Sequence, residues 1–173
     1  MPLTPIHIGF AVFVYSIFIF LDPIALVLGT ILIDLEPIMN MIFNIGKLHG
    51  KLHSLLGIVV LTFPIAAISC GCFRLFKLDR YIKKFKWINS LISSSLGLTS
   101  HIFFDGIVYS EMVVLYPFSP KTGLLLDLWS AQTNILILMI LLCVGIVVLV
   151  VRYIINRYFK KNELETNMIL EEN

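Results

Sequence analysis

The fold class is decided by the stretch NILILMILLCVGIVVLVVRYII, residues 134–155, which is apolar almost throughout. A transmembrane helix needs about 20 predominantly apolar residues to cross roughly 30 Å of hydrocarbon, and this stretch is long enough to do so. Four other stretches meet or nearly meet this requirement, namely residues 6–21, which are short, 23–44, 52–76 and 87–108. The sequence therefore predicts an all-α, polytopic membrane helix bundle of about five transmembrane helices.

The composition of the whole chain agrees with a membrane protein. Of its 173 residues, 58% are hydrophobic and 14% are charged, and the mean hydropathy is +0.94. Soluble domains carry about 25% charged residues, so an ordinary soluble domain is excluded. The length suits one compact unit. We expect a single membrane-embedded domain over residues 1–161 and a polar, flexible C-terminal tail over residues 162–173.

The positions of the basic residues predict how the bundle lies in the membrane. Most Lys and Arg residues fall in two regions, 74–86 and 152–161. Basic residues gather in cytoplasmic loops, so we expect the N-terminus outside and the C-terminus inside the cytoplasmic (inner) membrane. The net charge is only +2, and there is no concentrated basic face, so we do not expect nucleic acid as a partner. The expected partner is membrane lipid.

Ionisable side chains in the predicted spans are the candidates for chemistry. Each costs about 2.5–3.5 kcal/mol at a helix centre on the translocon scale, so such groups pair with one another or hold an ion. They are Asp34, Glu36, His101 and Asp105 within or beside spans, and His7 and His53 at span ends. Because Asp34 and Glu36 lie about 200° apart on a regular helix, they face one point only if Pro37 distorts the turn.

The spacing of the histidines predicts a shared metal site. His49 and His53 are four residues apart, and so are His101 and Asp105, so each pair projects from one face if its segment is helical. This is the geometry by which an HExxH motif places two imidazoles on one zinc ion. Imidazole and carboxylate suit zinc, manganese or iron. We therefore predict a divalent metal site, zinc first, within residues 1–120 and open to the outside.

A resemblance to a known family is carried by four segments, TPIHIG (4–9), GTILIDLEP (29–37), HGKLHSLLG (49–57) and HIFFDGIVYSEMVVLYPF (101–118). In order and spacing they resemble the prokaryotic membrane-bound, predicted metal-dependent hydrolases, also described as LexA-binding, inner-membrane-associated hydrolases. The family motif PDxD reads IDLE here, and HRxxTHS reads HGKLHS. These departures indicate a divergent branch that keeps Asp34 and the histidines.

The resemblance implies a hydrolase, and a site partly sunk in the bilayer favours a lipid-like or phosphoester substrate. The predicted metal ligands are Asp34, His49, His53, His101 and Asp105, with Asp105 either bridging or orienting His101. Glu36 is the predicted general base, and His7 is a further ligand or an acid. We expect Glu111 and Tyr116 near the cavity rim to contact the substrate.

Two other classes of function stay open at this point. Intramembrane carboxylates and histidines also serve proton and cation pathways, so the first alternative is a metal- or proton-translocating protein. Such a path needs polar groups that reach the inner face, for which the sequence offers Asp22 and Ser16, with Thr62 and Ser69 in the third predicted span. The second alternative is a non-catalytic membrane binding protein.

Overall fold

The computed structural model describes residues 4–44, 49–77, 86–125 and 128–171, with the side chains of those between residues 6 and 162. In these ranges the regular secondary structure is helical, without strands. Four helical stretches are long and apolar enough to cross a membrane, and a fifth helix is apolar but shorter. The prediction of an all-α membrane bundle of about five helices is confirmed.

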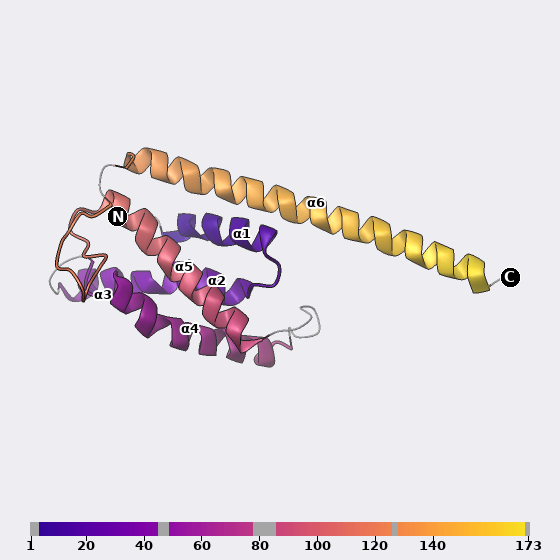
Figure 1. The fold of residues 1–173 in the computed structure, drawn as a ribbon, viewed down its shortest axis with the longest axis horizontal. Coiled ribbons are helices and arrows are strands. Elements are labelled where there is room, and N and C mark those ends of the chain that lie inside the picture. Colours follow the sequence, from indigo (N-terminus) through magenta and orange to yellow (C-terminus); the bar gives the residue numbers. More distant parts are fainter. Residues whose placement is uncertain (1–3, 45–48, 78–85, 126–127, 172–173) are drawn as a thin grey trace.

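The helices follow the predicted order (Figure 1). They are η1 (Thr4–His7), α1 (Ile8–Ile17), α2 (Pro23–Ile31), η2 (Leu32–Asp34), α3 (Leu35–Phe43), α4 (Leu55–Leu75), α5 (Trp87–Val108) and α6 (Ala131–Glu171). The second predicted span is thus interrupted by the 3-10 turn η2. Pro37 explains this interruption, because it has no N–H for the preceding turn and its ring crowds the carbonyl four residues earlier.

Asp22 begins α2 and ties it to two other helices. Its Oδ1 accepts hydrogen bonds from the backbone N–H groups of Ile24 at 2.9 Å and Ala25 at 3.0 Å. Its Oδ2 accepts hydrogen bonds from the hydroxyls of Ser69 in α4 and Ser90 in α5, both at 2.6 Å. Hydrogen bonds to an ionised group are the stronger kind, so this buried carboxylate stabilises the packing of α2, α4 and α5.

Helix α5 is the central helix of the bundle. Of its candidate span, 61% is buried, against 17–33% for the other three. It packs closely on α2 because two glycines meet there: a Cβ on Gly97 would lie 2.4 Å from the carbonyl oxygen of Leu26 and 3.0 Å from Gly29 Cα. Small residues let membrane helices approach closely. The close contact brings the C-terminal half of α5 beside the end of α2.

Helix α6 packs against α1 and runs on well beyond the bundle (Figure 1). Arg152 donates hydrogen bonds to the carbonyl oxygens of Ser16 and Ile17, where α1 ends. The predicted tail starts at residue 162, but α6 continues as a helix to Glu171. The Glu, Leu and Met residues of this segment have high helix propensity, and a helix that is already formed needs no new nucleus to extend.

Candidate metal centre

The predicted site residues meet at one end of the bundle. They come from η1, η2, the start of α3, the segment before α4 and the C-terminal half of α5. The four histidines and two of the acids are at most 5% exposed, namely His7, Asp34, His49, His53, His101 and Asp105. Glu36 is partly buried. The fold thus gathers every residue that the sequence predicts for the site, from segments far apart in the chain.

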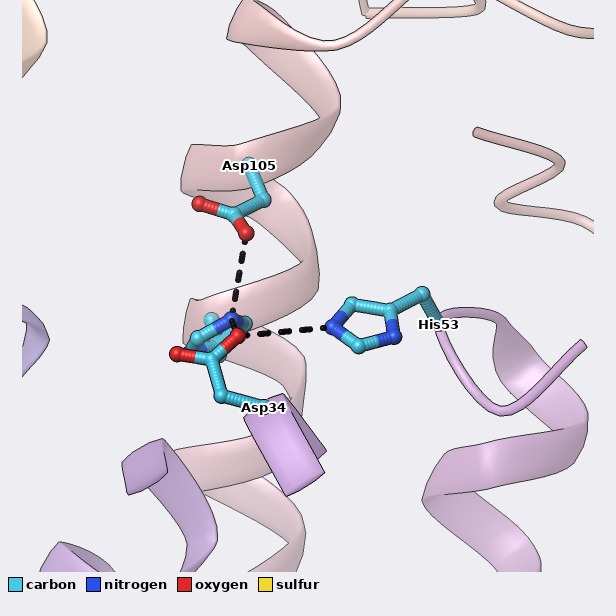
Figure 2. A group of neighbouring side chains, drawn as sticks. Asp34, His53 and Asp105 are labelled. Carbon is cyan, nitrogen blue, oxygen red and sulfur yellow. Dashed lines mark ion pairs between the residues drawn. The ribbon is translucent and has the colours of Figure 1, made fainter. Parts of the chain in front are cut away.

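Four of these residues bring potential ligand atoms together. Asp34, His53, His101 and Asp105 each offer one such atom, all within 4.8 Å of one another. His101 Nε2 lies 3.1 Å from Asp34 Oδ1 and 3.2 Å from Asp105 Oδ2. His53 Nε2 lies 3.7 Å from Asp34 Oδ1. Figure 2 shows Asp34, His53 and Asp105 pointing toward one another. Ligands on a tetrahedral zinc ion are about 3.3 Å apart, so this spacing suits a metal.

Unsatisfied polar atoms at the centre support the same conclusion. Within the described residues, the buried atoms that lack a hydrogen-bond partner include His53 Nε2, His101 Nε2 and Asp105 Oδ2. Buried polar atoms are nearly always hydrogen-bonded, so a cluster of unsatisfied ones needs an explanation. A divalent cation would accept the lone pairs of the two histidine nitrogens. The residues present therefore fit a metal ion.

Two of the candidate ligand histidines have their rings fixed by a contact of the second ring nitrogen. His53 Nδ1 lies 2.8 Å from Glu36 Oε2, and His101 Nδ1 lies 2.8 Å from the carbonyl oxygen of Thr30. Metal-binding histidines nearly always use their second ring nitrogen in this way, which fixes the orientation of the ring. In both residues the contact leaves Nε2 facing Asp34.

Glu36 holds the segment that precedes α4. Its Oε1 accepts a hydrogen bond from the backbone N–H of Leu52 at 3.1 Å, and its Oε2 accepts one from the backbone N–H of His53 at 3.2 Å. Oε2 also contacts the His53 ring. The sequence predicts Glu36 as the general base, and the structure places it on the far side of His53 from Asp34. Its oxygens are therefore already engaged in positioning His53.

Gly50 leaves the space that the Glu36 carboxylate occupies. A Cβ at this position would lie 2.2 Å from Glu36 Oε1, so Gly50→Ala has to displace that carboxylate. We expect Gly50→Ala to lower the zinc affinity about 10–100-fold, as losses of outer contacts to metal ligands do. Competition with a chromogenic chelator measures this affinity. Gly71→Ala is the matched control, because a Cβ there meets nothing within 4 Å. Equal affinities in the two variants would contradict the positioning role.

His7 and His49 lie beside the group of four. His7 Nε2 is 3.1 Å from Asp105 Oδ1, and His49 Nε2 is 3.7 Å from Asp105 Oδ2. His49 Nδ1 is 3.0 Å from Glu111 Oε1. Burial by itself lowers the pKa of His49, but the contacts with Asp105 and Glu111 outweigh it and hold that pKa above its ordinary value. Asp105 thus connects the group of four to the two remaining histidines.

Comparisons with known proteins add no family assignment. No family model, no curated protein and no solved structure matches the chain. The resemblance to membrane-bound hydrolases therefore stays a prediction from the motifs, and the function is argued from the geometry of the site.

Proposed function

We propose that this chain is a membrane-bound, metal-dependent hydrolase of the family that its motifs resemble, with zinc as the metal and manganese or iron as the other candidates. The observation that carries this proposal is the buried group Asp34, His53, His101 and Asp105, whose ligand atoms lie within 4.8 Å of one another inside an apolar helix bundle. Buried charges in a bundle of this kind need an ion or each other, and they mark functional sites.

Asp34, His53 and His101 supply three ligands, which is the number that catalytic zinc sites use beside a water. When bound, the metal supplies Lewis-acid polarisation of an ester or phosphoryl oxygen and lowers the pKa of water. We assign Asp105 as the group that would take the proton from the attacking water, since its Oδ2 lies beside these ligands, 3.2 Å from His101 Nε2, and is not needed as one of the three. His7, on Asp105 Oδ1, holds that carboxylate in place.

We further propose that the site opens to the outer face of the cytoplasmic membrane. The support is that basic residues mark the opposite end of the bundle: Arg74 lies in the last turn of α4 and Lys86 precedes α5. Arg152 contacts the end of α1 that is remote from His7. Other basic residues behind this orientation, Arg80, Lys83 and Lys84, lie outside the described residues.

Metal removal tests the proposed reaction. The detergent-purified protein is expected to hydrolyse short-chain lipid esters or phosphoesters, to lose this activity after dialysis against a chelator, and to recover it when zinc is added back. Hydrolysis that survives complete removal of the metal would contradict the proposal.

Metal or proton translocation is the alternative from another class of function. Toward the other end of the bundle, the hydroxyls of Ser69 and Ser90 both donate hydrogen bonds to the Asp22 carboxylate, which supports a packing role for these polar groups. Zinc flux into liposomes that contain the protein, without hydrolysis of any ester, would favour translocation over the hydrolase.

A further inference from the structure

A pocket of about 370 Å³ lies beside the metal centre. Its lining includes His49, Lys51, Glu111 and Tyr116. His49 connects the pocket to the centre, because its buried ring lines the pocket while its Nε2 lies 3.7 Å from Asp105 Oδ2. A molecule bound in this pocket would therefore sit one side chain away from the proposed hydrolytic group.

The walls of the pocket are fixed to one another. The backbone N–H of Leu55, at the start of α4, donates a hydrogen bond to the carbonyl oxygen of Val114 at 2.9 Å, and that of Leu56 donates to the carbonyl oxygen of Tyr116 at 3.2 Å. These bonds join the segment after α5 to the start of α4. The pocket is thus largely formed in advance, as ligand sites usually are.

Among the lining residues in the described chain, Lys51 is the one Lys or Arg. Its Nζ lies 5.4 Å from the centroid of the Tyr116 ring, a cation–π distance that keeps the ammonium beside the pocket. The acidic lining residue, Glu111, is engaged with the His49 ring at 3.0 Å. The ammonium group of Lys51 is therefore available as the counter-ion of an anionic ligand.

The segment that forms one wall also carries exposed apolar side chains. Phe118 is 85% exposed, and Leu124 and Leu128 are about half exposed. Exposed apolar side chains beside a polar pocket, at the end of a bundle of membrane helices, indicate contact with the membrane interface. A pocket of about 370 Å³ has room for a headgroup. A ligand would enter from the lipid, with its acyl chains left in the bilayer.

We propose that this pocket binds the phosphate of a lipid headgroup, with Lys51 as its counter-ion, and that this lipid is the substrate of the proposed hydrolase. The proposal rests on the proposed function for its reaction step. In that step water adds to an ester group of the lipid and the ester bond breaks. The acid that is released keeps the water oxygen, and the alcohol that is released takes one proton of the water.

Binding of a lipid phosphonate tests the pocket without hydrolysis. Three probes are titrated calorimetrically into the detergent-purified, zinc-loaded full chain: a dioctanoyl lipid phosphonate whose P–C bond resists water, neutral dioctanoylglycerol, and inorganic phosphate. We expect the phosphonate to bind best and Lys51→Met to weaken its binding about tenfold, as the loss of a charged hydrogen bond does. We expect Lys51→Arg to retain most of the binding.

Lys121→Met is the matched control, since Lys121 is an exposed lysine of the segment after α5 and does not line the pocket. Equal binding of the phosphonate and the neutral lipid, or unchanged binding in Lys51→Met, would overturn the proposal. If inorganic phosphate bound as tightly as the phosphonate, the proposal that the bound phosphate belongs to a lipid would be overturned. If the parent protein contained no metal, this result would contradict the proposed function instead. Binding of the phosphonate to that metal-free protein would still test the pocket.

Discussion

Replacing Asp34 by asparagine is expected to lower the zinc affinity of the protein by more than about 100-fold, because changes to the outer partners of a metal ligand alone reach about 10–100-fold. Asp34 is fully buried, and its Oδ1 faces the Nε2 atoms of both His53 and His101. Asparagine keeps the shape of the side chain but removes the negative charge that a divalent cation prefers. Zinc titration in competition with a chromogenic chelator measures the change.

Asp22→Asn is the matched control for this experiment. Asp22 is a carboxylate that is equally withdrawn from solvent, at 2% exposure, but it lies at the start of α2. It is held by Ser69 and Ser90 instead of by histidines. We expect Asp22→Asn to lower the thermal stability and to leave the zinc affinity unchanged. An equal loss of zinc affinity in both variants would show that the loss follows general destabilisation.

Asp105→Asn is expected to slow hydrolysis by about 10²–10⁴-fold at saturating zinc, which is the range that a general base contributes. The variant still offers Asp34, His53 and His101 to the metal, so we expect zinc to bind at high concentration. Glu36→Gln is expected to act differently. This substitution weakens the contact that orients the His53 ring, so we expect a lower zinc affinity. Excess zinc is then expected to restore most of the hydrolysis rate.

The comparison of these two variants decides between two assignments of the base. The sequence predicts Glu36, whereas the hydrogen bonds of Glu36 to the segment before α4 favour Asp105. A loss in Glu36→Gln that persists at saturating zinc and equals that of Asp105→Asn would restore Glu36 as the base. The rate at several zinc concentrations, for both variants and the parent, provides the measurement.

The long helices of the fold could be predicted from sequence because the bilayer imposes their length. The predicted span 87–108 coincides with α5 (Trp87–Val108), and the predicted span 52–76 nearly coincides with α4 (Leu55–Leu75). The first span was predicted too long, since α1 covers only Ile8–Ile17. Hydropathy does not distinguish residues inside a helix from apolar residues in the turn that follows it.

The site was predicted in part. The spacing of His101 and Asp105 correctly indicates one helical face, since both lie in α5 with His101 Nε2 at 3.2 Å from Asp105 Oδ2. The spacing of His49 and His53 puts them on one face only if their segment is helical, and α4 begins only at Leu55. The reason is that Glu36 takes the backbone N–H groups of the preceding segment, a contact between residues distant in the sequence.

Other features of the site could not be predicted from the types of residue in the sequence. The Nδ1 of His101 contacts the backbone carbonyl of Thr30, which any residue at that position could offer. The different roles of Asp34, which faces the histidine Nε2 atoms, and Glu36, which contacts His53 Nδ1, depend on the 3-10 turn η2 ahead of Pro37. A proline indicates a distortion there, but it does not indicate which of the two acids then faces the histidines.

Elemental analysis of the detergent-purified protein is the most direct test of the proposed metal centre. The parent protein, expressed in medium that contains zinc, manganese and iron, is analysed beside Asp34→Asn, His53→Ala and the control Asp22→Asn. We expect about one bound divalent metal per chain in the parent and in Asp22→Asn, and far less in the two site variants. A parent protein without metal, or site variants with as much metal as the parent, would contradict it.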